Sequence, residues 1–118
     1  MPMQASDLVG RHVLEVGRRE GLPFVTFGNG PVERREVRLV IETRYAVEVS
    51  RPSTREPLEE LMYLAVIAVE IADGELRLAF DLGPRLVVSA EREVWTGDAP
   101  WSISDEYTTP LWPPADHT

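Results

Sequence analysis

The feature of this 118-residue chain that most constrains its fold is an internal repeat. Pairs of identical or similar residues lie 53 positions apart: Leu8/Leu61, Val13/Val66, Val16/Val69, Gly21/Gly74, Val25/Leu78, Phe27/Phe80, Gly30/Gly83 and Pro31/Pro84. After these pairs the spacing falls to 47, because residues 38–41 (RLVI) match residues 85–88 (RLVV). The first half therefore carries six extra residues, 32–37, in one connection. Matching at a fixed spacing indicates two copies of one structural unit.

The second half shows the unit most clearly. A capping sequence at 53–57, followed by apolar residues on one face, predicts a helix at about 55–64. Residues 67–71 and 76–80 alternate between apolar and small or polar side chains, and Asp73-Gly74 between them is a strong hairpin signal. A third strand follows a Gly-Pro corner. Each unit is therefore predicted to be a helical turn followed by a three-stranded antiparallel meander.

The third strand of the first half is unusually long in the sequence pattern. From 37 to 49 every odd position is apolar or β-branched and the even positions are mostly charged, which is typical of a strand with one buried face. No Gly, Pro, Asn or Asp interrupts this run. We expect one long bent strand that crosses the sheet, with a hairpin turning at Glu42-Thr43 as the alternative.

These patterns predict an α+β domain that is mainly β. The expected architecture is an antiparallel sheet or a partly closed barrel, built from two pseudo-repeated three-stranded meanders. The length and the apolar content of 43% suit a single domain over 1–118. Within it we expect a first half-repeat at about 6–50, a second at about 54–97, and a tail at about 98–118 that is rich in proline and tryptophan. In this tail we expect a strand or turn near residues 101–103 and irregular structure after it.

Composition excludes several kinds of function. The formal net charge of −8 argues against nucleic acid as a partner, because affinity for phosphate depends on a basic face. No stretch approaches the roughly 20 apolar residues of a membrane helix, and the first residues lack a signal-peptide pattern, so we expect a cytoplasmic protein without membrane association. The chain has no cysteine, and its two histidines, His12 and His117, lie at opposite ends. We therefore expect no metal, no cofactor and no catalytic residue.

Three segments carry a resemblance to a known family. Residues 8–13 fit L-x-G-x-x-V, residues 73–80 fit D-G-x-L-x-L-x-F, and residues 93–95 fit E-x-W. Together they resemble the motif string of a small actinobacterial family known only as a domain of unknown function, over about residues 7–97. The resemblance implies the β-rich architecture and implies no activity.

Four residues near the end of the chain are candidates for binding: Glu91, Glu93, Trp95 and Trp101. An exposed tryptophan beside acidic residues is typical of a protein-binding hot spot. Glu91 and Glu93 would share one face of a strand, as a glycosidase pair or a divalent metal site requires. The alternatives are that the two carboxylates form a solvated sheet edge and that Trp95 closes the core.

Two hypotheses of different classes follow. The first is a non-catalytic protein-binding module, such as an immunity or antitoxin-like protein, whose acidic surface binds a basic protein partner. The second is a small ligand-binding protein or carboxylate-dependent enzyme, with a pocket lined by Glu91, Glu93 and Trp95. A concave cavity beside these residues would favour the second hypothesis and a flat acidic face the first. A homodimer that pairs edge strands is compatible with both.

Overall fold

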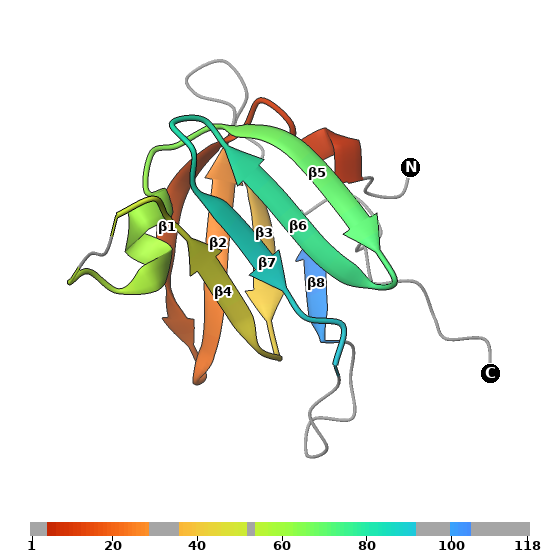
Figure 1. Cartoon of the computed structure of the whole chain (residues 1–118). Coiled ribbons are helices and arrows are strands. Elements are labelled where there is room, and N and C mark those ends of the chain that lie inside the picture. Colours follow the sequence, from red (N-terminus) through yellow and green to blue (C-terminus); the bar gives the residue numbers. More distant parts are fainter. Residues whose placement is uncertain (1–4, 29–35, 52–53, 92–99, 105–118) are drawn as a thin grey trace.

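The computed structural model describes residues 5–28, 36–51, 54–91 and 100–104. All paired strands are antiparallel, and the two helical elements (η) are short 3₁₀ helices (Figure 1). In chain order the elements are η1 (Ala5–Leu8), β1 (His12–Arg19), β2 (Leu22–Gly28), β3 (Val37–Ile41), β4 (Tyr45–Glu48), η2 (Pro57–Leu61), β5 (Val66–Ala72), β6 (Glu75–Phe80), β7 (Arg85–Val88) and β8 (Trp101–Ser104).

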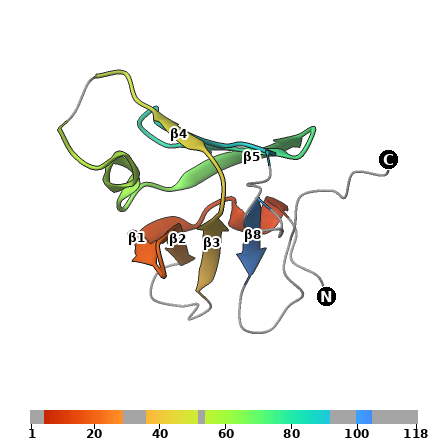
Figure 2. The same cartoon turned by 90° about the horizontal axis from the view of Figure 1, so that it is seen from below.

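The strands form two four-stranded sheets that face each other as two layers (Figure 2). The first sheet has the order β1-β2-β3-β8 and the second the order β4-β7-β6-β5. The predicted class, mainly β with a small helical part, is confirmed, and the described strands form two sheets rather than one sheet or a closed barrel. Each predicted meander supplies three strands of one sheet, and the fourth strand of each sheet comes from the other half of the chain.

The alternating segment 37–49 passes from one layer to the other (Figure 2). The predicted hairpin alternative is wrong, because β3 pairs with β2 and β8 whereas β4 pairs with β7. The segment is instead two strands separated by residues 42–44, and backbone bonds to both sheets hold this bend. The Glu42 N–H donates to the Pro100 carbonyl at 2.7 Å, and the Ser89 N–H donates to the Arg44 carbonyl at 2.9 Å.

The helix predicted at about 55–64 is shorter and more tightly wound. It is a 3₁₀ helix over Pro57–Leu61, with the Met62 N–H donating to the Glu59 carbonyl at 3.2 Å. Tyr63 then adopts a left-handed conformation with φ 66°, which ends any helix. The apolar face that suggested a longer helix is nevertheless used, since both leucines of η2 are buried in the core.

Backbone hydrogen bonds relate the two halves of the chain. The isolated bridge between His12 and Ala65 joins residues 53 apart, and a matching hydrogen bond lies on each side of it. In one bond the donor belongs to the first half and in the other it belongs to the second half, and the donors and acceptors of the two bonds are each 53 positions apart. The bonds are Val13 N–H to the Leu64 carbonyl at 2.9 Å and Val66 N–H to the Arg11 carbonyl at 2.8 Å.

The hairpins of the two halves also match in their backbone conformation. Glu20 and Gly21 join β1 to β2 with φ values of 54° and 83°, while Asp73 and Gly74 join β5 to β6 with 53° and 81°. Two consecutive positive φ values define a type I′ turn, which suits the twist of a two-residue hairpin. Residues at this spacing of 53, or of 47 between β3 and β7, are called counterparts below.

The fourth strands hold equivalent places as well. Tyr45 of β4 pairs with Val88, and Trp101 of β8 pairs with Ile41. Because Ile41 and Val88 are counterparts, Tyr45 and Trp101 occupy equivalent positions in the two sheets, although their sequence spacing differs from that of the meanders.

The core lies between the two sheets and draws on both of them and on both helical turns. Its burial supplies the main stabilising free energy of such a fold. The core residues are Leu8, Val13, Val25, Phe27, Val37, Leu39, Ile41, Leu58, Leu61, Val66, Leu76, Leu78, Phe80, Leu86, Val88, Trp101 and Ile103.

No helix within the described ranges is long and apolar enough to span a membrane.

Candidate functional site

The structure places two of the four predicted binding residues. Trp101 has an exposed fraction of 0%, and its indole Nε1–H donates to the Gly74 carbonyl at 2.9 Å. It is therefore a core residue and not an exposed hot spot, because its pairing with β3 directs it between the sheets. Glu91 is exposed, and its N–H donates to Ser89 Oγ at 3.0 Å. Glu93 and Trp95 lie outside the described residues, so a site that combines them with Glu91 stays a prediction.

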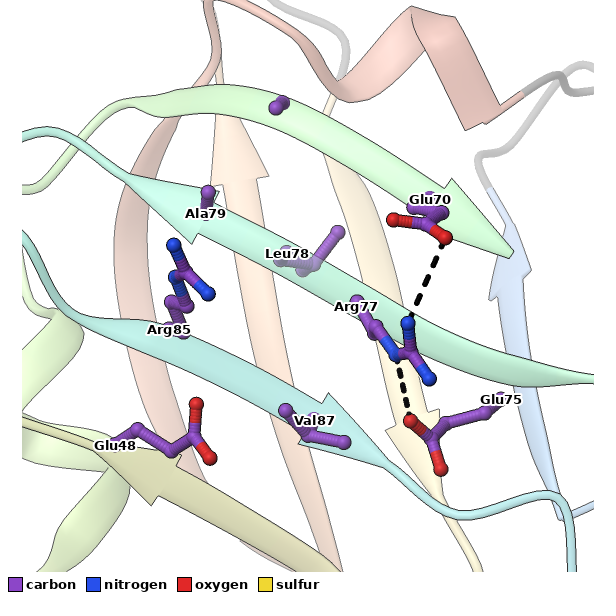
Figure 3. A pocket seen from close by; sticks show the side chains of 9 residues that line it. Glu48, Glu70, Glu75, Arg77, Leu78, Ala79, Arg85 and Val87 are labelled. Atoms are coloured by element: carbon purple, nitrogen blue, oxygen red, sulfur yellow. Dashed lines mark hydrogen bonds and ion pairs between the residues drawn. The ribbon is translucent and has the colours of Figure 1, made fainter. Parts of the chain in front are cut away.

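A different site is formed by the outer face of the second sheet. A hollow of about 530 Å³ lies over its four strands, on the side away from the core (Figure 3). Apart from the core residue Leu78, outward positions line it, because alternate residues of a strand share a face. The lining residues are Glu48, Ala68, Glu70, Glu75, Arg77, Leu78, Ala79, Arg85 and Val87.

The floor of this hollow is made of small and apolar side chains. Ala68 and Ala79 are opposite each other in the pairing of β5 with β6, and Val87 of β7 is opposite Arg77, two positions along from the pair Ala79 and Arg85. Methyl-sized side chains flanked by long charged ones leave a depression. Ile67 borders the floor and is 58% exposed, because the bulge between Val66 and Ala68 adds one unpaired residue to β5.

One end of the rim is a network of charges around Arg77. Its Nε donates to Glu75 Oε1 at 2.7 Å, and its Nη1 lies 3.5 Å from Glu70 Oε1 (Figure 3). The hydrogen bond to Glu75, with the negative charges of Glu75, Glu70 and Asp73, raises the pKa of Arg77 above its usual value. Arg77 is therefore already paired with carboxylates of the protein itself.

The other end of the rim carries a second arginine, Arg85, which differs from Arg77 in its ion pairing. Arg85 pairs in register with Glu48, yet its side chain extends towards Ala79 and away from that carboxylate (Figure 3). Among the described residues Arg85 has no ion-pair partner within 4.0 Å. Its guanidinium and the Glu48 carboxylate are thus both open to a group that enters the hollow.

The corresponding place on the first sheet is filled. Phe24 and Thr26, the counterparts of Arg77 and Ala79, are only 7% and 3% exposed. The guanidinium of Arg38 lies over the Phe24 ring at 5.0 Å from its centroid, and its Nε donates to Thr26 Oγ1 at 3.4 Å. A ring covered by a cation therefore occupies the space that stays open in the second half.

The residues of the hollow were not singled out from the sequence. A signal was available, since Phe24 and Arg77 are counterparts of opposite character, and so are Glu15 and Ala68. Reading it requires the register of four strands, one of which comes from the other half of the chain.

Comparison of the chain with family models, with curated proteins and with solved structures found no match. The resemblance to an actinobacterial family of unknown function therefore stays a prediction.

Proposed function

We propose that this chain is a non-catalytic protein-binding module that holds a basic protein partner on the outer face of its second sheet. The observation that carries the proposal is the hollow over Ala68 and Ala79, with its apolar floor and its charged rim. An immunity or antitoxin-like protein would act in this way.

The layout of this face supports binding of a protein. Interfaces concentrate their binding energy in an apolar centre surrounded by a polar rim. Here Ala68, Ala79 and Val87 form the centre. Ile67, the neighbour of Ala68 in the sequence, is 58% exposed and adds apolar area at the start of β5.

The charge of the rim supports a basic partner. Its carboxylates are Glu48, Glu70 and Glu75 and its guanidinium groups are Arg77 and Arg85, so the rim carries −3 + 2 = −1. The chain as a whole carries −8, which steers basic molecules towards it and repels nucleic acid. Glu48 is open to a lysine or arginine of the partner.

The open guanidinium of Arg85 adds one element of specificity. Its counterpart Arg38 stacks on the ring of Phe24, and a ring from a partner could be held by Arg85 in the same manner. The proposed partner segment is therefore basic and presents one aromatic side chain.

The test is affinity capture with tagged protein from a lysate of the source organism, read by quantitative mass spectrometry. The variant Ala79→Arg fills the hollow. Its matched control is Ser102→Arg, which changes an outward residue of β8 in the first sheet. We expect the wild type and Ser102→Arg to recover one basic protein in stoichiometric amount, and Ala79→Arg to recover at least about tenfold less.

Two results would overturn the proposal. One is equal recovery of the same protein by Ala79→Arg and by the wild type, which would place the interface elsewhere. The other is a concentration-dependent dimer in light scattering that Ala79→Arg converts to a monomer, because the hollow would then hold a second copy of this chain.

A further inference from the structure

A second, smaller cavity opens at the end of the sandwich where the β1–β2 hairpin meets β4 and η2. Its volume is about 190 Å³, and it shares no residue with the hollow on the second sheet. Its lining combines apolar side chains with three charged side chains. The cavity can therefore hold an apolar ring and a charged group at the same time. The lining residues are Val16, Gly17, Arg18, Pro23, Tyr45, Glu56, Leu58 and Glu59.

The opposite end of the sandwich shows what such a space accommodates. There the indole of Trp101 is wholly buried and donates its N–H to the Gly74 carbonyl at 2.9 Å. Tyr45 holds the position equivalent to Trp101, and Gly21 is the counterpart of Gly74.

The smaller phenol of Tyr45 leaves its end of the sandwich incompletely filled. Within the described ranges, the Gly21 carbonyl accepts a long hydrogen bond of 3.4 Å from Arg18 Nη1. That carbonyl has a second lone pair and so retains the capacity to accept a further N–H.

We infer that this cavity binds a small planar aromatic amine, whose ring takes the place that the Trp101 indole takes at the other end. The ring would lie against Val16, Pro23 and Leu58. The volume is below the roughly 300–1,000 Å³ of pockets for drug-sized ligands, which limits the occupant to one or two fused rings.

The charges at the cavity select the sign of the ligand. Glu56 and Glu59 of the η2 region contribute two carboxylates against the single guanidinium of Arg18, a local sum of −2 + 1 = −1. An ammonium group is therefore favoured over a carboxylate, by a modest amount because all three side chains are exposed.

The first experiment titrates the protein with tryptamine and follows the amide signals of Gly17 and Gly21 by two-dimensional NMR. We expect saturable shifts with a dissociation constant below about 1 mM. Indole-3-acetate, which has the same ring and the opposite charge, should bind at least about fivefold more weakly. Absence of saturable shifts with tryptamine, or equal binding of the two probes, would overturn the inference.

The second experiment fills the cavity from within. Tyr45→Trp should place an indole in the cavity, at the position equivalent to that of Trp101 in the other sheet. The substitution should raise the midpoint temperature of unfolding and weaken the affinity for tryptamine at least about tenfold. The matched control is Tyr63→Trp, since Tyr63 is 74% exposed and does not line the cavity. This control should leave tryptamine binding unchanged.

A third variant keeps the test decisive if Tyr45→Trp fails to fold. The double substitution Glu56→Gln with Glu59→Gln alters only exposed side chains. It should weaken the binding of tryptamine and leave the binding of uncharged indole unchanged. Unchanged tryptamine binding in this variant would contradict the assigned role of the carboxylates.

Discussion

Replacement of Trp101 by alanine should remove the largest single contribution to the core. The side chain is the largest of those that are completely buried, and it joins the last strand of the first sheet to the hairpin of the second through Gly74. Since the two sheets come from interleaved segments of the chain, this contact also fixes β8 in its place.

The expected loss can be worked out from burial and hydrogen bonding. Truncation of a buried tryptophan to alanine costs about 3–5 kcal/mol, including the cavity that is left. The conservative change Trp101→Phe keeps a ring in place but leaves the Gly74 carbonyl without its donor and loses some volume, which together cost about 1–3 kcal/mol. Domains of this size have a total stability of about 5–15 kcal/mol, so the phenylalanine variant should remain folded.

The assay is urea unfolding followed by far-UV circular dichroism, with the free energy of unfolding obtained by linear extrapolation. The matched control is Tyr45→Ala, at the equivalent position of the other sheet. Because Tyr45 is only half-buried beside a cavity, its loss should cost about 1–2 kcal/mol. A loss for Trp101→Ala that is below about 1 kcal/mol, or no greater than that for Tyr45→Ala, would refute the assignment of Trp101 to the core.

Two further predictions concern the backbone. Glu20→Asn should raise the free energy of unfolding by about 0.5–1 kcal/mol in the same assay, because asparagine adopts the left-handed conformation before Gly21 more readily than glutamate; a lower stability would contradict the turn assignment. Gly28→Ala should be destabilising by about 0.5–1.5 kcal/mol, because a Cβ atom there would lie 2.4 Å from Leu14 Cδ1 and would force that partly exposed side chain out of its rotamer. The variant Leu14→Ala should remove most of that penalty, and an equal penalty in both backgrounds would show that the clash is not its cause.

Local signals in the sequence predicted most of the strands. The alternating segments 67–71 and 76–80, with Asp73-Gly74 between them, correspond to β5 and β6 and their turn. Beyond the bulge at Ile67, these elements depend on neighbouring residues alone, since alternation sets the buried face and the turn residues set the register.

The predicted helix was only partly right, for a reason that lies outside its own sequence. A helical face and a proline in the first turn fit an α-helix and a 3₁₀ helix equally well. What decides the outcome is the segment after it, where the Tyr63 N–H donates to the Val13 carbonyl at 2.9 Å. The chain must leave the helix there to reach the first half.

The sequence by itself determined the strand-rich class, the hairpins and the inward face of strands without a bulge, because these follow from periods and turns of a few residues. The bulge before Ala68 turns Ile67 outward, which the alternation did not predict. Only the tertiary structure decided that β4 and β8 join the opposite sheets. That exchange buries Trp101 at one end of the sandwich, leaves a cavity beside Tyr45 at the other, and opens the hollow over Ala79. The physical reason is that exposure and cavity volume depend on which distant strands are neighbours, and local patterns do not specify this.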